Sequence, residues 1–105
     1  MITNFQQKVY KICKKIPKGR VSTYKEIAKA LNTKAHRAIG QALAKNPFSP
    51  EIPCHRVVKS DGNIGGFMGK TKGNKIKKKI DLLKKEGIIV NNKKIVDKKI
   101  ILKNI

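Results

Sequence analysis

The sequence predicts a mainly helical fold with small β elements, containing a helix-turn-helix of the kind found in winged-helix DNA-binding domains. Three observations predict this class. Apolar residues recur at helical spacing in four segments, a short polar turn joins the second and third segments, and short apolar runs are separated by Gly and Asn turns. At 105 residues the chain is long enough for a single modest core, so we expect one domain over residues 1–105.

The first helix is expected to begin near Phe5 and to end at Pro17 and Gly19. Cys13 lies beside its apolar stripe, and a free cysteine is commonly a small buried hydrophobic residue. We therefore expect a structural role for Cys13. The residues that form the stripe, with lysines on the other face, are Phe5, Val9, Ile12 and Ile16.

The second and third helices are expected on either side of a polar turn at Asn32 and Thr33. Thr23 can cap the second helix by accepting a hydrogen bond from the amide of Glu26, whose side chain would reach back to Thr23. The third helix should end at Asn46, because a residue before proline disfavours helical backbone. Two short helices joined in this way are typical of a helix-turn-helix, although other helical hairpins share the pattern. The second helix is expected to turn Ile27, Ala28 and Leu31 inward, and the third helix runs through Ala35, Ala38, Ile39, Ala42 and Leu43.

The second half of the chain alternates turns with short elements. A proline-rich loop at 47–53 is followed by Val57 and Val58, which with Ile64 flank a predicted hairpin turn, and then by a glycine-rich stretch at 65–69. A last helix carries Ile76, Ile80, Leu82 and Leu83, runs to Glu86 and stops at Gly87. Apolar runs on both sides of Asn91 and Asn92 predict a C-terminal hairpin or tail over 91–105.

The charge of the chain points to a polyanionic partner. There are 26 Lys and Arg residues against six Asp and Glu, which leaves a net charge of +20. This exceeds what solubility requires, so nucleic acid is the leading partner and an anionic membrane surface the second. A general bias of composition towards Lys, Ile and Asn accounts for part of the excess. No apolar run is long enough to span a bilayer and no signal peptide is recognisable, so we expect a cytoplasmic protein without a membrane.

The segment Pro53-Cys54-His55-Arg56 carries the most chemical information. It places a thiol beside an imidazole and a guanidinium, and nearby positive charge favours the reactive thiolate. His55 can reach Cys54 directly or through a water, if a carboxylate from elsewhere orients the ring. Among the six acidic residues, Glu86 at the end of an amphipathic helix is the best candidate. A buried thiol beside a surface histidine is the alternative interpretation.

Metal binding is not expected. Cys54 and His55 are adjacent, whereas Cys13 and His36 are isolated, so no spacing of metal ligands is present. We place His36 on the surface of the third helix.

Taken together, these motifs resemble the active-site domain of the O6-alkylguanine-DNA alkyltransferases over about residues 5–90. The motif Pro53-Cys54-His55-Arg56-Val57-Val58 is the most specific part of the resemblance. The supporting segments, which fall in the family's order, are Gly19–Tyr24, Arg37–Gly40, Asn46-Pro47, the glycine-rich stretch and Leu82–Gly87.

The resemblance implies that the chain moves an alkyl group from O6 of guanine in double-stranded DNA onto its own Cys54, once per molecule and without a cofactor. It implies that a relay of His55, a water and Glu86 makes Cys54 a thiolate. Asn46 would tie the helix-turn-helix to the active-site loop. Tyr24 would assist the departure of guanine as a proton donor.

The resemblance also implies how DNA is bound, by a protein that we expect to be a monomer. Arg37 would occupy the gap left by a nucleotide flipped through the minor groove, where the small Ala38 and Gly40, together with Tyr24, approach the DNA closely. Arg56 and the lysines would serve the phosphate backbone or the framework. Departures from the family's commoner residues near the pocket leave the accepted size of alkyl group open. The pocket itself would be lined by Ser49, Val57, Phe67 and Met68.

Two other functions remain as alternatives. The alkyltransferase-like proteins are short relatives that recognise lesions without transfer and replace the cysteine, usually with tryptophan. Cys54 argues against that group, whereas the single-domain length argues for it. A winged-helix DNA-binding regulator would explain the charge and the helix-turn-helix but not the cysteine motif.

Overall fold

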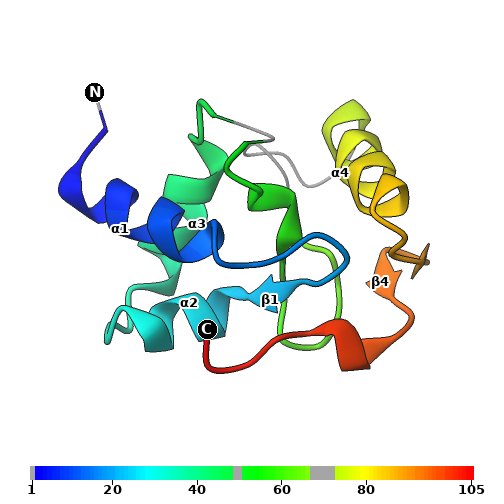
Figure 1. The fold of residues 1–105 in the computed structure, drawn as a ribbon. Coiled ribbons are helices and arrows are strands. Elements are labelled where there is room, and N and C mark those ends of the chain that lie inside the picture. The colour runs from blue at the N-terminus through cyan, green and yellow to red at the C-terminus, as the bar shows by residue number, and fades with distance from the viewer. Residues whose placement is uncertain (1, 49–50, 67–72) are drawn as a thin grey trace.

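The computed structural model describes residues 2–48, 51–66 and 73–105, and within these ranges four α-helices lie where the sequence predicts them. The fold is mainly helical with small β elements, as predicted. The first three helices lie together on one side and the fourth on the other, with the segment around residue 54 between them (Figure 1). The helices are α1 (Asn4–Cys13), α2 (Tyr24–Ala30), α3 (His36–Ala44) and α4 (Asn74–Lys85), and a 3-10 turn, η1, covers Cys54–Arg56.

Helix α1 begins with a reciprocal cap. The hydroxyl of Thr3 accepts a hydrogen bond from the amide of Gln6 over 3.1 Å, and the amide of Thr3 donates to the Gln6 side chain over 2.8 Å. The helix ends at Cys13, earlier than the predicted end at Pro17, but Ile16 is fully buried beyond it. The expected structural role of Cys13 fits its burial. The buried face of α1 consists of Val9, Tyr10 and Cys13.

Helices α2 and α3 pack against each other and form the predicted helix-turn-helix. Thr23 caps α2 as predicted, accepting from the amide of Glu26 over 3.1 Å, and Asn32 in the turn has a φ of 53°. The prediction that the Glu26 side chain reaches back to Thr23 was wrong. Its Oε1 accepts instead from the amide of Asn104 over 2.8 Å, because the C-terminal tail runs past the start of α2.

Strands β1 (Ser22–Thr23) and β2 (Val57–Val58) form a parallel pair. The turn predicted between β2 and Ile64 is present, since the amide of Lys59 donates to the carbonyl of Asn63 over 2.8 Å. Val57, Val58 and Ile64 flank this turn as predicted, but the fully buried valines pair with β1, and the amide of Ile64 donates to the carbonyl of Lys93 over 2.9 Å. The pairing places the start of α2 beside the chain that leaves η1.

The predicted C-terminal hairpin is confirmed. Strands β3 (Val90–Asn91) and β4 (Lys94–Ile95) are antiparallel. The two residues between them, Asn92 and Lys93, have φ values of 55° and 62°. Two consecutive residues with positive φ are typical of the turns that match the twist of two-residue hairpins.

Residues 98–105, on which the sequence was uninformative, add a further segment beside β1. After a second 3-10 turn, η2 (Lys98–Ile100), the amide of Leu102 donates to the carbonyl of Val21 over 2.7 Å. The amide of Val21 in turn donates to the carbonyl of Ile100 over 3.1 Å. The tail is therefore hydrogen-bonded to the chain that leads into the helix-turn-helix.

The core joins α1, the helix-turn-helix, both strands of the parallel pair and α4. Burial of these apolar side chains supplies the main driving force for folding. Apolar side chains without any exposed surface come from the helices, from β2 and from the chain between α1 and β1: Val9, Cys13, Ile16, Val21, Ile27, Ile39, Val57, Val58 and Leu83.

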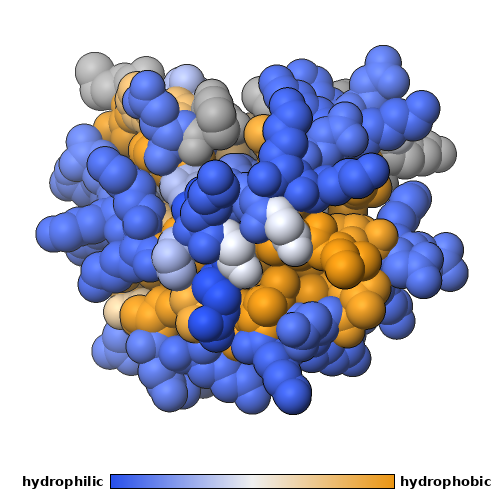
Figure 2. Space-filling view, turned by 45° about the vertical axis from the view of Figure 1, so that its right-hand side comes forward, coloured by the Kyte–Doolittle hydropathy of each residue, from blue (hydrophilic) through white to orange (hydrophobic). Residues whose placement is uncertain are grey.

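The side of the molecule that carries α4 and β4 exposes a hydrophobic area bordered by hydrophilic residues (Figure 2). Ile89 is 70% exposed and Val96 is 56% exposed, and the amide of Val96 donates to the carbonyl of Ile89 over 3.1 Å. None of the helices in the described ranges is long and apolar enough to cross a membrane.

Candidate active site

Cys54 begins the 3-10 turn η1, directly after Pro53 at the end of the proline-rich loop. Its amide donates to the carbonyl of Ile52 over 2.8 Å, and the residue is 5% exposed. The thiol therefore sits in a shielded position on a stretch of backbone with little freedom.

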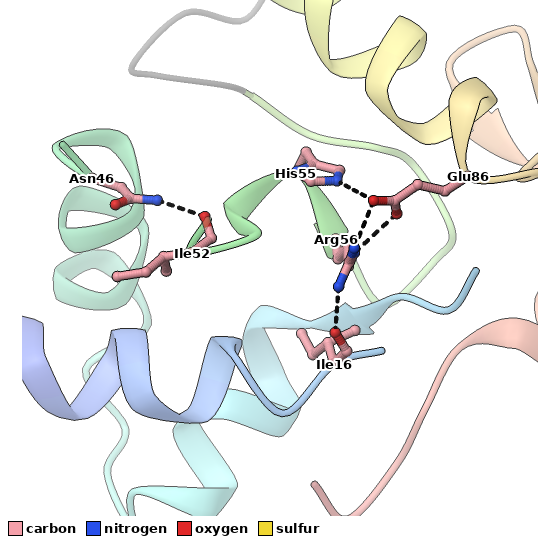
Figure 3. A network of polar contacts seen from close by, with 6 residues as sticks. All are labelled: Ile16, Asn46, Ile52, His55, Arg56 and Glu86. Atoms are coloured by element: carbon pink, nitrogen blue, oxygen red, sulfur yellow. Dashed lines mark hydrogen bonds and ion pairs between the residues drawn. The ribbon is translucent and has the colours of Figure 1, made fainter. Parts of the chain in front are cut away.

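Asn46 holds the loop from the upstream side. This residue follows α3, is 4% exposed, and donates from Nδ2 to the carbonyl of Ile52 over 2.9 Å (Figure 3). Its Oδ1 accepts from the amide of Phe48 over 2.9 Å. The end of the helix-turn-helix is thus tied to the residues just before Cys54, which is the arrangement expected for Asn46.

Glu86 holds the same segment from the downstream side. It caps the C-terminal end of α4, and its Oε2 lies 3.0 Å from Nε2 of His55 (Figure 3). Arg56 donates to this carboxylate with both Nε, over 2.9 Å to Oε1, and Nη2, over 2.6 Å to Oε2. Among the six acidic residues, the partner of His55 is therefore Glu86, the one predicted from the sequence.

The hydrogen bonds to Glu86 determine which nitrogen of His55 carries a proton. Burial raises the pKa of Glu86, but the hydrogen bonds from Arg56 and His55 outweigh it and hold that pKa below its ordinary value. A carboxylate only accepts, so Nε2 of His55 must be the donor. Burial lowers the pKa of His55, although Glu86 opposes this effect. The neutral ring then leaves Nδ1 without a proton.

Nδ1 of His55 is buried and has no hydrogen-bond partner among the described residues. Buried polar atoms nearly always have partners, so an exception calls for an explanation. An unprotonated ring nitrogen next to a cysteine in the chain is suited to accept that cysteine's proton.

Arg56 lies in the framework of the site. Besides its two bonds to Glu86, it donates from Nη1 to the carbonyl of Ile16 over 2.7 Å (Figure 3). The three nitrogens Nε, Nη1 and Nη2 therefore all donate within the protein. Arg56 was expected to serve either the phosphate backbone of DNA or the framework of the protein. Hydrogen bonds within the protein are those that the framework role requires.

Tyr24, the first residue of α2, lies against the start of the glycine-rich stretch. Gly65 has a φ of +71°, and a Cβ there would lie 3.4 Å from the Tyr24 hydroxyl oxygen. Burial raises the pKa of Tyr24 to about 12. The phenol therefore keeps its proton at neutral pH and remains a hydrogen-bond donor.

Helix α3 presents small and charged residues to the surface. Arg37 is exposed and makes no hydrogen bond or ion pair within the described part of the chain, and His36 is exposed as expected. Ala38 is partly exposed, and a Cβ at Gly40 would meet no atom within 4 Å. Packing of the protein itself therefore does not require glycine at position 40.

Three of the four predicted pocket residues, Ser49, Phe67 and Met68, lie outside the described residues. The fourth, Val57, is fully buried in β2. In the ranges that the structure describes, no group of three or more His, Cys, Asp or Glu side chains is placed to hold a metal ion.

Sequence reasoning missed Lys79, which has no exposed surface. Its Nζ donates to the carbonyls of Val57 over 2.9 Å, Gly66 over 3.0 Å and Ile64. Burial lowers the pKa of Lys79 to about 7, whereas three accepting carbonyls match the three donors of the charged ammonium. The side chain thus ties α4 to the segments after Cys54 and around Gly65.

A signal for Lys79 is present in the sequence. It lies three residues after Ile76 and four before Leu83, on the apolar stripe of α4. A search for helical periodicity that counts only apolar residues does not detect a buried lysine at such a position.

Comparison with known proteins assigns the family. The model of the DNA-binding domain of 6-O-methylguanine DNA methyltransferase matches residues 4–88. The chain belongs to this family.

Curated relatives in the methyltransferase family are about twice as long. The methylated-DNA–protein-cysteine methyltransferase of Methanothermobacter thermautotrophicus is 44% identical over 86 residues, which cover 82% of this chain and 46% of the relative. That of Sulfolobus acidocaldarius is 45% identical, over 83% of this chain and 52% of the relative. The chain therefore spans about half the length of these methyltransferases.

Solved structures of similar proteins share the fold. The O6-methylguanine-DNA methyltransferase of Pyrococcus kodakaraensis aligns with a TM-score of 0.71 and 43% identity, over 83% of this chain and 48% of that one. Atl1 of S. pombe, solved with damaged DNA containing O6-carboxymethylguanine, aligns with a TM-score of 0.82 and 29% identity, over 98% of this chain and 99% of that one.

Replacing Lys79 by methionine should destabilise the fold by about 2–4 kcal/mol, because the carbonyls of Val57, Ile64 and Gly66 lose their donor. Urea unfolding of Lys79→Met measures the loss. The matched control is Lys78→Met, an exposed neighbour on the same helix, which should change the free energy of unfolding by no more than about 0.5 kcal/mol. Equal effects of the two substitutions would show that the carbonyl contacts of Lys79 contribute nothing.

Proposed function

We propose that this chain repairs DNA by moving an alkyl group from O6 of guanine in duplex DNA to the sulfur of its own Cys54. The observation that carries the proposal is the His55–Glu86 pair: Glu86 holds Nε2 of the ring, and the buried Nδ1, which has no hydrogen-bond partner among the described residues, can act as a base for the preceding residue, Cys54. Membership of the methyltransferase family and the names of its relatives support the same reaction.

His55 and Tyr24 take part in different proton transfers. Nδ1 of His55 takes the proton of the Cys54 thiol, directly or through a water, and Glu86 stabilises the imidazolium that results. The sulfur attacks the alkyl carbon, the carbon–sulfur bond forms and the bond from carbon to O6 of guanine breaks. The Tyr24 hydroxyl donates a hydrogen bond or a proton to the departing guanine. The thioether is stable, so each molecule acts once and the step needs no cofactor.

The DNA is bound through the helix-turn-helix. Arg37, which has no described partner in the protein, fills the gap left by a nucleotide flipped out through the minor groove. Ala38 and Gly40 keep the surface of α3 low beside it. The net charge of +20 attracts the phosphate backbone without regard to sequence. Arg56 we assign to the framework of the active site, since its guanidinium is engaged by Glu86 and Ile16.

Relatives solved with DNA support the binding of DNA by this chain. One is the Mycobacterium tuberculosis OGT in complex with DNA, which aligns with a TM-score of 0.72 and 38% identity, over 82% of this chain and 51% of that one. We propose that a single molecule of this chain binds a duplex in the same general way.

A second candidate is recognition of damaged guanine without transfer. The observation that favours it is the match to Atl1, which covers nearly the full length of both chains. Recognition alone does not require a shielded Cys54 or a His55 ring oriented by Glu86. We therefore favour transfer over recognition.

Mixing the protein with a duplex that carries one O6-methylguanine should add one methyl group to each molecule. Intact-protein mass spectrometry followed by peptide mapping should place the methyl group on Cys54. The methylation should stop at one equivalent. The thiol of Cys13 is the internal control, because burial raises its pKa to about 12 and keeps it protonated. Lesion-selective binding with no change of mass would reject transfer in favour of recognition.

The single-turnover rate should depend on the protonation of His55. As pH falls, Nδ1 takes up a proton and can no longer serve as the base, so the rate should decline on the acid side. Because burial lowers the pKa of His55, the decline should begin below the ordinary value of 6.5. His55→Asn should react roughly 10²- to 10⁴-fold more slowly at neutral pH. The same profile in wild type and variant would exclude His55 as the base.

Gly40 should matter for DNA binding and not for stability. Gly40→Ala should unfold at the same or a slightly higher urea concentration, because alanine favours helix by up to about 1 kcal/mol. Gly40→Gln should be similarly stable, since nothing in the protein lies within 4 Å of a Cβ there, but should bind duplex roughly tenfold more weakly. Equal affinity of Gly40→Gln and Gly40→Ala would mean that α3 does not approach DNA at this residue.

A further inference from the structure

An open cleft of about 460 Å³ lies between α2 and the C-terminal tail. One wall comes from the helix-turn-helix and the other from residues 98–103, with the turn around residue 60 between them. Its lining consists of Thr23, Lys25, Glu26, Lys29, Ser60, Lys98, Ile101 and Lys103.

The tail wall is held in place by hydrogen bonds to β1 and its neighbours. The hydroxyl of Ser22 donates to the carbonyl of Leu102 over 2.9 Å, and Arg20 donates from Nε to the carbonyl of Ile100 over 3.1 Å. With the two backbone bonds of Val21, these contacts fix the course of the tail on both sides of Ile101. This wall lies beyond residues 4–88, to which the family model is matched.

The charge of the cleft is strongly positive. Its four lysines are exposed, and three of them, Lys25, Lys98 and Lys103, make no hydrogen bond or ion pair within the described residues. The fourth, Lys29, donates to the Asn104 side chain over 2.8 Å. The single acidic residue, Glu26, is 9% exposed and is engaged by the amide of Asn104. The positive charges therefore face solvent, whereas the negative charge is turned into the protein.

The cleft begins next to the candidate active site. Thr23 is both a lining residue and the N-cap of α2, and the next residue is Tyr24. A strand whose backbone passes Tyr24 can therefore continue directly into the cleft. The exposed hydroxyl of Ser60 and the lysine side chains supply the donors that phosphate oxygens accept.

We propose that this cleft binds the phosphate backbone of the DNA beside the lesion, and that Lys98 and Lys103 extend the DNA-binding surface beyond the family domain. The inference rests on the proposed function in one respect, namely that duplex DNA lies across Tyr24. The ligand class is a polyanionic strand, and the contacts carry no base specificity. Binding through the cleft adds affinity for all duplexes and leaves the chemistry at Cys54 unchanged.

The test compares two double variants that remove the same charge. Lys98→Gln/Lys103→Gln removes the two tail lysines that line the cleft, whereas Lys8→Gln/Lys11→Gln removes two lysines on α1, which line a different pocket. Affinity for an undamaged duplex is measured over a series of salt concentrations. Each phosphate contact contributes about 0.9 to the slope of log affinity against log salt, so the cleft variant should lose about 2 from this slope and the α1 variant almost nothing.

Methyl transfer to Cys54 in the same variants separates the two claims. At low salt and saturating DNA, the α1 variant should react at the wild-type rate, and the urea unfolding of the cleft variant should match that of the α1 variant. An unchanged slope in the cleft variant, or an equal loss in both variants, overturns the cleft inference while transfer stands. If wild type binds duplex but never transfers, the proposed reaction fails, and the difference in slopes still decides the cleft.

Discussion

The rest of the structure depends on the carboxylate of Glu86. It stands at the end of α4 and accepts hydrogen bonds from His55 and Arg56, two residues that directly follow the cysteine. Through Nη1 of Arg56 the same network reaches the carbonyl of Ile16, just after α1. Removing one partner from such a partly buried ion pair is costly, because the remaining charge loses its compensation. One acidic side chain therefore joins both halves of the fold at the site.

The same network has a chemical and a mechanical consequence. Chemically, an ionised Glu86 places the proton of His55 on Nε2 and leaves Nδ1 as the base. Mechanically, Glu86 holds the segment after Cys54 while Asn46 holds the loop before it. Lys79 adds a third restraint from α4, by donating to the carbonyl of Val57 and to those of the segment that follows the turn. A nucleophile held from three sides needs little rearrangement before it reacts.

Local sequence patterns predicted much of the fold and of the site. Particular residues show where a local pattern did not predict the partner found in the structure. The helices followed from apolar spacing, and Glu86 was selected as the partner of His55 because few acids compete for that place. Glu26 was predicted to complete a capping box, but the amide of Asn104, 78 residues further on, became its partner. The valines of β2 flank the predicted turn, but their partner in the sheet is the distant strand β1 and not the chain across the turn. In both cases a long-range partner replaced a local one.

The sequence by itself determined the helix-turn-helix, the C-terminal hairpin, the excess of positive charge and the juxtaposition of Cys54, His55 and Arg56, because these depend on spacing and on neighbours in the chain. Only the tertiary structure decided that Nε2 of His55 faces Glu86, that Arg56 is turned inward, that Lys79 is buried, and that the tail forms a basic cleft with α2. These features depend on which distant groups meet in the folded core. Buried charges and buried polar groups are stable only where the fold brings them hydrogen-bonding or oppositely charged partners.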